Sequence, residues 1–454
     1  MSTLDNNKDI KKADPGKTAR AEQRELRRKE REKAREAKKA EREERARERA
    51  AKREKRISAK EEGRGVKDII NQGLQELSNM EDVSDATGQF RSLLLEQLAR
   101  IDKMEQSAAP KDFGSLDVIK IGVCPGDGIG PSISEQTERV LRHLLAPEIE
   151  SGKIELIAIN GLTIQNRLAT MEAVPKDVLE EIKQCDVLLK GPTTTPKGGS
   201  LESANVKLRR ELDLYANVRP VQVPELGIDW IFYRENTEGE YALGSKGIEL
   251  PGKLSIDFKV TTEAGTKRIA KAAYEYAVAN GKTNIQIVTK ANILKKTDGN
   301  FSRICHELAL DYPTLKLEDW YVDIMSAKLL DDKRRRDFQV FVLPNLYGDI
   351  ITDEAAEIQG GVGTAGSANI GDQYAMFEAI HGSADRMIED GRGQYANPAS
   401  LMKAAAMMLR HIGYIAQAER LEKALTEAVD AVKLTGHDDG ATAAEFTDYM
   451  LERL

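Results

Sequence analysis

The chain has few cysteines and few aromatic residues, and it has no long apolar run. Its three cysteines, Cys124, Cys185 and Cys305, lie far apart and show no metal-ligand spacing. We therefore expect reduced thiols in a cytoplasmic protein, not a disulfide scaffold or a zinc site. No run of about 18 apolar residues occurs, so we expect no membrane-spanning helix. The N-terminal segment has no apolar signal core, and it contains more acidic residues than a transit peptide does, so we expect neither targeting signal.

The charges are distributed unevenly along the 454 residues, which carry a formal net charge of −7. Residues 17–62 are almost entirely Lys, Arg, Glu and Ala, and 24 basic and 15 acidic residues precede Gly65. These are helix formers, but they lack the apolar seam of a coiled coil. Residues 1–64 are thus predicted to be a charged tail, helical or disordered. Its interleaved acids and its lack of aromatics argue against a nucleic-acid partner.

Residues 65–106 have a different character, because apolar residues recur there at helical spacing. The recurring residues are Ile69, Ile70, Leu74, Leu77, Phe90, Leu93, Leu94, Leu95, Leu98 and Ile101. Residues 82–88 interrupt the pattern, which predicts two amphipathic helices joined by a turn. Such a pair suits self-association or docking on the main body. Residues 107–116, with Pro110 and Gly114, are predicted to be a linker.

From Val118 onward, short apolar runs alternate with helical stretches, which favours an α/β fold with a mostly parallel, helix-covered sheet. The predicted strands are residues 118–123, 154–159, 187–189, 228–233, 285–288 and 340–343. The turn from Gly126 to Gly130 reads G-x-G-x-G and does not match the dinucleotide-binding fingerprint. The residue types are those that any tight turn from a strand into a helix needs.

Three arginines follow one another within about 25 residues, each beside an apolar run. They are Arg209, Arg219 and Arg234, and Ser203 and Asn205 precede the first of them. Guanidinium groups bind carboxylates in a bidentate fashion. Convergence of the three would therefore indicate a substrate with two or three carboxylates, although each alone could form a structural ion pair.

Asp349 and Asp353 stand four residues apart after a hydrophobic run. A helix that begins near Tyr347 would place both carboxylates on one face. Clustered carboxylates suit a hard divalent cation that also takes ligands from an anionic substrate. Asp323, which follows Trp320-Tyr321-Val322, is a third candidate ligand. An exposed acidic helix start is the alternative interpretation.

Several further residues follow predicted strands, where open α/β sheets place their sites. Lys290 comes directly after the strand 285–288, and its pKa would be lowered near arginines and a metal, which suits a proton acceptor. Tyr241 lies on a loop after the strand 228–233 and could donate a proton. His381 and the small residues around it precede a glycine-rich loop and Asn397. That arrangement suits a flat ring and phosphates, although a lone histidine is often structural.

Taken in order, these segments resemble the isocitrate/isopropylmalate dehydrogenase family of metal-dependent decarboxylating dehydrogenases, over residues 118–454. The resemblance implies a two-domain subunit with a non-Rossmann cofactor site. Residues 117–215 and 358–454 would form the large domain, and residues 216–357 a small domain with the dimer interface. It also implies a homodimer or larger homo-oligomer in which each site takes a lysine and an aspartate from the other protomer.

The resemblance also assigns roles to residues of this chain. Tyr241 and Lys290 would be the acid and the base. Mg²⁺ or Mn²⁺ would be held by Asp323, Asp349 and Asp353. Substrate carboxylates would be bound by Ser203, Asn205, Arg209, Arg219 and Arg234. NAD or NADP would be bound by Thr194, Thr195, Asn292, Glu378, His381, Gly382, Arg386 and Asn397.

Within this resemblance, the pair Ser203-x-Asn205 favours isocitrate, a tricarboxylate, over isopropylmalate, homoisocitrate or tartrate. Asp385 favours NAD, because an acid accepts a hydrogen bond from the ribose 2′-hydroxyl, whereas Arg386 favours NADP. We lean to NAD. A non-catalytic scaffolding protein that acts through its N-terminal arm is the alternative from another class. The presence of Lys290 and of all three aspartates favours an enzyme.

If the charged tail is a solvated appendage, its removal should not affect the chemistry. Deletion of residues 1–65 is expected to leave the turnover of the isolated enzyme nearly unchanged, as measured by initial rates at saturating substrate. A large loss of activity would contradict this interpretation.

Overall fold

The computed structural model describes residues 33, 41, 44–52, 81–106, 109–196, 201–243, 246–250, 252–361, 363 and 365–454. The chain divides into two compact units, Met1–Thr87 and Gly88–Leu454. In the first unit, residues 44–52 of the charged tail are helical and exposed. Most of the tail and the first of the two expected amphipathic helices lie outside the described residues. No described helix is both long and apolar enough to cross a bilayer.

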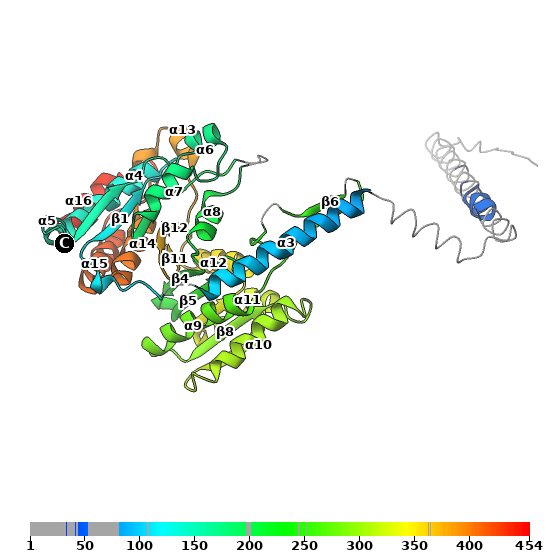
Figure 1. The fold of residues 1–454 in the computed structure, drawn as a ribbon. Helices are drawn as coiled ribbons and strands as arrows, with labels where there is room; N and C mark the ends of the chain where they lie inside the picture. The colour runs from blue at the N-terminus through cyan, green and yellow to red at the C-terminus, as the bar shows by residue number, and fades with distance from the viewer. Residues whose placement is uncertain are drawn as a thin grey trace, which may run out of the picture. The chain divides into compact units, whose positions relative to one another are not determined.

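A ten-stranded sheet runs through the second unit in the order β2-β1-β3-β12-β11-β4-β5-β10-β8-β9 (Figure 1). All six strands predicted from the sequence are confirmed to within two residues. These are β1 (Ile119–Cys124), β2 (Ile154–Ala158), β3 (Val187–Lys190), β5 (Ile228–Glu235), β8 (Asn284–Thr289) and β10 (Val340–Leu343). The other four are β4 (Ala216–Val223), β9 (Lys316–Tyr321), β11 (Gly366–Ile370) and β12 (Ala375–Ala379). A separate hairpin consists of β6 (Ile248–Leu250) and β7 (Leu254–Ile256).

The sheet is mostly parallel, as predicted, but its centre is antiparallel. Of the nine neighbouring pairs among the described residues, six are parallel and three are antiparallel. Two antiparallel pairs, β4–β5 and β11–β12, are joined by only four residues each. Connections this short allow only antiparallel pairing, because a parallel crossover needs a dozen or more residues.

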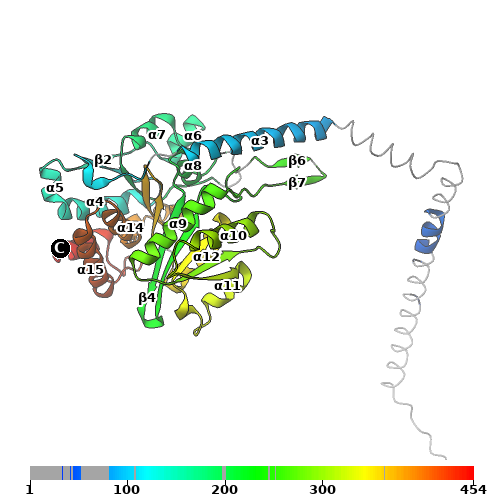
Figure 2. The same ribbon diagram turned by 60° about the horizontal axis from the view of Figure 1, so that its bottom comes forward.

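Helices cover both faces of the sheet, as Figures 1 and 2 show. In chain order after α3 (Glu81–Glu105), they are α4 (Gly130–Leu144), α5 (Ala146–Glu150), α6 (Ile164–Thr170), α7 (Lys176–Lys183), α8 (Ala204–Glu211), α9 (Glu263–Ala279), α10 (Thr297–Ala309), α11 (Val322–Leu329), α12 (Asn345–Ile358), α13 (Asp385–Glu389), α14 (Ala399–His411), α15 (Ile415–Ala431) and α16 (Ala443–Leu451). Alternate residues of β5 show the layering. Ile231 and Tyr233 join the core cluster that contains α9 and α14, whereas Trp230 and Phe232 join the cluster of α11 and α12. A strand buried on both faces needs an almost continuous apolar sequence.

The expected division into a large and a small domain stays a prediction. A separate apolar cluster lies among β3, α7 and α8, and another lies among β5, β10, α11 and α12. Their residues fall mainly in 117–215 and in 216–357, respectively. The largest cluster draws residues from both ranges and from 358–454, and the sheet continues through all three.

The helix α3 (Glu81–Glu105) corrects one expectation. The turn predicted at residues 82–88 is wrong, because these residues are helical. The single Gly88 costs about 1 kcal/mol and does not end a helix. From Gly88 on, α3 docks on the main body: Leu93 is buried and Phe90 stacks on Phe258 at 5.4 Å between ring centroids.

The glycine turn after β1 serves close backbone packing. Gly126 has a φ of +73°, and a Cβ atom there would lie 2.1 Å from the carbonyl oxygen of Pro192. Gly128 has a φ of +58°, and its Cβ would lie 2.0 Å from the carbonyl oxygen of Ser383. The glycines thus let three loops meet at the carboxyl ends of β1, β3 and β12. The structure agrees with the tight-turn interpretation of this motif.

The Gly126→Ala variant should lose more than about 3 kcal/mol of unfolding free energy, because it combines a strained φ with a backbone clash. Gly281→Ala is the matched control, since Gly281 also has a positive φ (+66°) but has open space around it. It should lose only about 1 kcal/mol. Denaturant unfolding measures both, and equal losses would contradict the packing argument.

Candidate functional site

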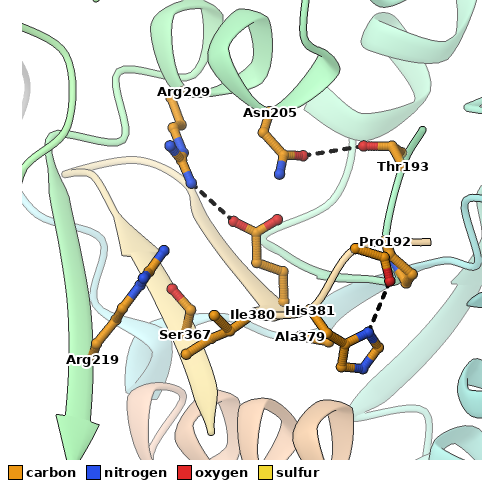
Figure 3. A pocket seen from close by; sticks show the side chains of 11 residues that line it. Pro192, Thr193, Asn205, Arg209, Arg219, Ser367, Ala379, Ile380 and His381 are labelled. Atoms are coloured by element: carbon orange, nitrogen blue, oxygen red, sulfur yellow. Dashed lines mark hydrogen bonds and ion pairs between the residues drawn. The ribbon is translucent and has the colours of Figure 1, made fainter. Parts of the chain in front are cut away.

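A cavity of about 130 Å³ opens where β3, β4, β11 and β12 meet the start of α8 (Figure 3). Residues predicted to bind substrate or cofactor line much of it: Asn205, Arg209, Arg219, Glu378, His381 and Gly382. The parallel register of β3 and β12 places Lys190 opposite Glu378. Charged side chains from both strands therefore meet beside the cavity.

The substrate-binding candidates reach the cavity from two elements, as Figure 3 shows. Asn205 and Arg209 come from successive turns of α8, and Arg219 comes from β4. Asn205 Oδ1 accepts a hydrogen bond from the hydroxyl of Thr193 at 3.4 Å. Ser203 is the residue before α8, and its side chain makes no capping bond to that helix.

Glu378 is the buried charge at the centre of this arrangement. Its carboxylate accepts hydrogen bonds from Arg209 Nη2 at 3.2 Å, from Lys190 Nζ at 3.4 Å and from Asn369 Nδ2 at 2.9 Å. Burial alone would raise the pKa of Glu378, but Lys190 and Arg209 outweigh it and lower the pKa from 4.5 to about 2. The glutamate is therefore ionised and holds Arg209 at the cavity wall.

Two arginines of the cavity retain unused donors. The buried Nε atoms of Arg209 and Arg219 have no hydrogen-bond partner. Arg219 Nη1 donates to Thr352 Oγ1 at 2.6 Å and to Asp353 Oδ1 at 2.8 Å. A buried donor without a partner costs about 1–3 kcal/mol. An anionic ligand that accepts from both groups would remove this cost.

Arg234 is fully buried and links β5 to α12. It donates to Asn345 Oδ1 from Nε at 2.9 Å and from Nη2 at 2.7 Å, and it forms an ion pair with Asp349. The phenol of Tyr241 donates to the other oxygen of Asp349 at 2.9 Å. Burial and then the Asp349 charge raise the pKa of Tyr241, so its phenol keeps its proton.

The prediction that Asp349 and Asp353 share a face of one helix is confirmed. Both lie on α12, and both carboxylates approach Arg219, at 4.0 Å and 2.8 Å. Burial would raise the pKa of Asp349, but Arg234, the Tyr241 hydroxyl and Arg219 together lower it. The carboxylate of Asp349 is therefore ionised and available as a hard oxygen ligand.

Asp323 and Lys290 lie together, apart from these two aspartates. Lys290 follows β8, Asp323 lies in the first turn of α11, and Lys290 Nζ is 2.5 Å from Asp323 Oδ1. In the part of the chain that the structure describes, no three His, Cys, Asp or Glu residues gather into a possible metal site. One chain alone therefore does not bring the three predicted metal ligands together.

The predicted cofactor residues fall into two groups. Glu378, His381 and Gly382 line the cavity, and the Thr194 hydroxyl beside it lies 2.8 Å from Ser383 Oγ and 3.1 Å from Asp385. Thr195 follows Thr194, and Arg386 is exposed on α13. The other group, Asn292 and Asn397, does not line the cavity. Asn397 Oδ1 instead accepts from the backbone N–H of Ala399 at the start of α14.

His381 presents a neutral ring to the cavity. Burial lowers the pKa of its imidazole. Its Nδ1 lies 3.0 Å from the carbonyl oxygen of Gly382, and its buried Nε2 has no partner. A neutral ring with one unused nitrogen suits contact with an uncharged, planar group of a ligand.

Sequence reasoning missed two buried residues that organise the site. Lys190 ends β3 and pairs with Glu378, and its place at the carboxyl end of a predicted strand was the available signal. Asp127 lies in the glycine turn, where its carboxylate accepts from the N–H of Thr194 at 2.9 Å and of Ile164 at 2.7 Å. It thereby fixes the loop that carries Thr194.

Comparison with known proteins decides which family this site belongs to. The sequence profile of the isocitrate/isopropylmalate dehydrogenase family matches residues 120–453. The chain belongs to this family. It is 36% identical over 344 residues to a regulatory subunit of the mitochondrial NAD-type isocitrate dehydrogenase of Dictyostelium discoideum, and the match covers 74% of this chain and 92% of the relative.

Two further family members show the same extent of similarity. The chain is 37% identical over 353 residues to the probable alpha subunit of the mitochondrial NAD-type isocitrate dehydrogenase of Caenorhabditis elegans, covering 75% of this chain and 94% of the relative. The crystal structure of isocitrate dehydrogenase from Methylococcus capsulatus superposes with a TM-score of 0.66 at 34% identity, covering 74% of this chain and 99% of that one. The predicted family and α/β fold are thus confirmed, and α3 precedes the region that the family profile matches.

Replacement of Glu378 tests the buried charge cluster. Glu378→Gln should lower the unfolding free energy at pH 7 by about 3 kcal/mol, because Lys190 and Arg209 would remain buried without their counter-charge. The lowered pKa also means that Glu378 stabilises the fold above pH 4.5 and that this contribution disappears as the pH falls towards 2.

The free energy of unfolding should therefore change less between pH 4.5 and pH 2 in Glu378→Gln than in the unmodified protein. Glu419→Gln is the control, since Glu419 is exposed. If both variants show the same acid dependence, the buried ion pairs do not have the assigned effect.

Proposed function

We propose that this chain is a metal-dependent dehydrogenase that converts isocitrate to 2-oxoglutarate and CO₂ with reduction of NAD. The single observation that supports this most is the set of cationic side chains around one small cavity. Arg209 and Arg219 line it with unused Nε donors, and the neighbouring Arg234 is fully buried. Buried guanidinium groups of this kind suit a ligand with several carboxylates.

The choice of substrate rests on the relatives and on the start of α8. The family members named above are isocitrate dehydrogenases. Ser203 and Asn205 lie at the beginning of α8 beside Arg209 and offer neutral hydrogen-bonding groups for a third carboxylate. Isopropylmalate has an alkyl group instead, which would leave these polar groups without partners.

The carboxylates of α12 are suitable ligands for a divalent cation. Asp349 and Asp353 are oxygen donors on one face of α12, and nearby arginines keep Asp349 ionised. We propose that they hold Mg²⁺ or Mn²⁺ together with Asp323 of a second copy of the chain. When bound, such an ion would polarise the hydroxyl and carbonyl oxygens of the substrate. Arg234 and Tyr241 would then exchange part of their contact with Asp349 for the substrate.

Two side chains would transfer the protons. Lys290 is proposed to accept the proton of the substrate hydroxyl as that carbon is oxidised. Tyr241 is proposed to return a proton to the carbon that loses CO₂, and its raised pKa keeps the phenol protonated for this step. The arginines would hold the remaining carboxylates and so orient the substrate between acid and base.

NAD is proposed as the cofactor because of Asp385 and because the two relatives compared by sequence are named as NAD enzymes. The Asp385 carboxylate lies 3.1 Å from the Thr194 hydroxyl, beside the glycine turn. An acid in this position would repel a 2′-phosphate and accept from a 2′-hydroxyl. Thr194, Thr195, His381 and Gly382 are the remaining described contacts that we propose at this end of the cavity, with Asn292 and Asn397 further away.

We propose a homodimer or larger homo-oligomer with shared sites, since Lys290 and Asp323 lie together and apart from Asp349. Because the relatives are named as subunits, a mixed assembly is the alternative. The regulatory name of one of them keeps the non-catalytic interpretation as the second candidate.

A cytoplasmic location stays a prediction from the sequence, and both of these relatives are named as mitochondrial proteins.

Initial rates with isocitrate and Mg²⁺ test the activity, with NAD and NADP compared side by side. We expect turnover with NAD to exceed that with NADP, and Lys290→Ala to abolish turnover while substrate binding persists in part. Turnover of isopropylmalate but not of isocitrate would overturn the assigned substrate. Full activity of Lys290→Ala would remove the assigned base.

Mixing of two inactive variants tests whether the sites are shared. Co-expressed Lys290→Ala and Asp349→Asn chains should recover about a quarter of wild-type activity, because half of the dimers would contain one intact site of two. Each variant expressed alone is the control. No recovery in the mixture would place Lys290 and Asp349 of one chain in the same site.

A further inference from the structure

A buried polar cluster lies between α3 and the loop that carries Tyr241. Glu235, at the end of β5, and Glu238, three residues later, are both almost fully buried. The Glu235 carboxylate accepts from the N–H of Thr237 at 3.0 Å and from the N–H of Glu238 at 2.6 Å. The Glu238 carboxylate accepts from the N–H and the hydroxyl of Thr262. The loop is therefore wrapped around the two carboxylates, which accept its hydrogen bonds.

Only two cations reach this cluster among the described residues, and one of them comes from α3. Arg100 Nη1 lies 3.2 Å from Glu238 Oε1, and Arg100 Nη2 donates to Thr237 Oγ1 at 2.9 Å. Arg268 also donates to Thr237 Oγ1 at 2.9 Å, but its two Nη atoms bind the carboxylate of Asp213 at 2.7 and 3.0 Å. Because Arg268 is shared with Asp213, Arg100 is the direct counter-charge of Glu238.

The charge of Arg100 offsets part of the negative charge of this cluster. Burial, and then the negative charge of Glu238, raise the pKa of Glu235, whereas Arg268 and Arg100 oppose the shift. A buried ion pair that loses one partner leaves an uncompensated charge, which is strongly destabilising. Without Arg100, the two glutamates would repel each other and the loop would have to take up water or a proton.

The loop connects this cluster directly to the candidate site. The carbonyl oxygen of Glu238 accepts from Asn345 Nδ2 at 3.0 Å. Asn345 in turn accepts from Arg234, which pairs with Asp349, the acceptor of the Tyr241 hydroxyl. Tyr241 itself follows Glu238 by three residues. Any shift of Glu238 would therefore reach Tyr241 both along the backbone and through this chain of hydrogen bonds.

We propose that α3 is a part of the active site and that its Arg100 is a positioning residue: by neutralising Glu238, it holds the loop 235–241 so that the Tyr241 hydroxyl meets Asp349. Arg100 precedes residues 120–453, the part that the family profile matches. The docking of α3 thus supports the site with a residue that lies outside the region matched by the family profile. Phe90 against Phe258 and Glu96 with Lys246, at 2.6 Å, hold the helix in place.

The test is a set of variants of the full-length chain with two readouts. Arg100→Met should lower kcat at least about tenfold, because small displacements of a reacting group have large effects on rate. Arg100→Lys keeps the charge and should stay within about threefold of the wild type. Arg91→Met removes an exposed arginine of the same helix and should leave kcat unchanged.

A double-mutant cycle with Tyr241→Phe separates positioning from a general loss of stability. If Arg100 acts through Tyr241, the double variant should be no slower than Tyr241→Phe alone. Independent, multiplying losses would overturn the proposal, and so would a wild-type kcat in Arg100→Met or an equal loss in Arg100→Lys.

The kinetic part rests on the proposed function, so hydrogen exchange provides a readout without substrate. The amides of Thr237 and Glu238 donate to Glu235, and Arg100→Met should accelerate exchange of the peptide 235–241, whereas Arg91→Met should not. Unchanged exchange in Arg100→Met would overturn the proposal. Faster exchange in a protein that does not oxidise isocitrate would support the positioning role and refute the proposed function alone.

Discussion

The site depends on buried charges. These charges meet because strands that are distant in the sequence end at the same place. Glu378 lies between Lys190 and Arg209, and all three are largely removed from water. Each charge would be costly alone, so each requires the others to be in position. This mutual requirement makes the wall of the cavity rigid before any ligand arrives, and rigid donors lose little freedom when they bind a substrate.

The same principle operates at the other end of the site. Arg234 and Asp349 neutralise each other, and Tyr241 is held by Asp349. Behind them, Glu238 pairs with Arg100 of α3, and Arg268 donates to the hydroxyl of Thr237, which in turn donates to Glu235. The proposed acid–base chemistry would thus rest on two successive layers of charged and hydrogen-bonded side chains. Both layers attach to the ends of β5 and α12, which the central sheet fixes relative to each other.

Much of this could be predicted from the sequence where the signal is local. The strands were recognisable because a parallel strand buried on both faces is a short apolar run. The shared face of Asp349 and Asp353 follows from helix periodicity. The tight turn at Gly126 could also be recognised from its glycine spacing. The predicted break at residues 82–88 was wrong, because an interruption in apolar spacing does not by itself end a helix whose backbone hydrogen bonds continue. The roles of the individual site residues stay predictions.

Local sequence specifies which elements form and which ionisable residues stand at their ends, since backbone propensity and side-chain spacing depend on near neighbours. Only the packing of distant segments establishes which of those charges face one another. Lys190 and Glu378 are 188 residues apart and meet only because β3 and β12 are adjacent and in register. Arg100 reaches Glu238 only because α3 docks beside the loop. Such pairings depend on strand order and packing, which no local pattern specifies.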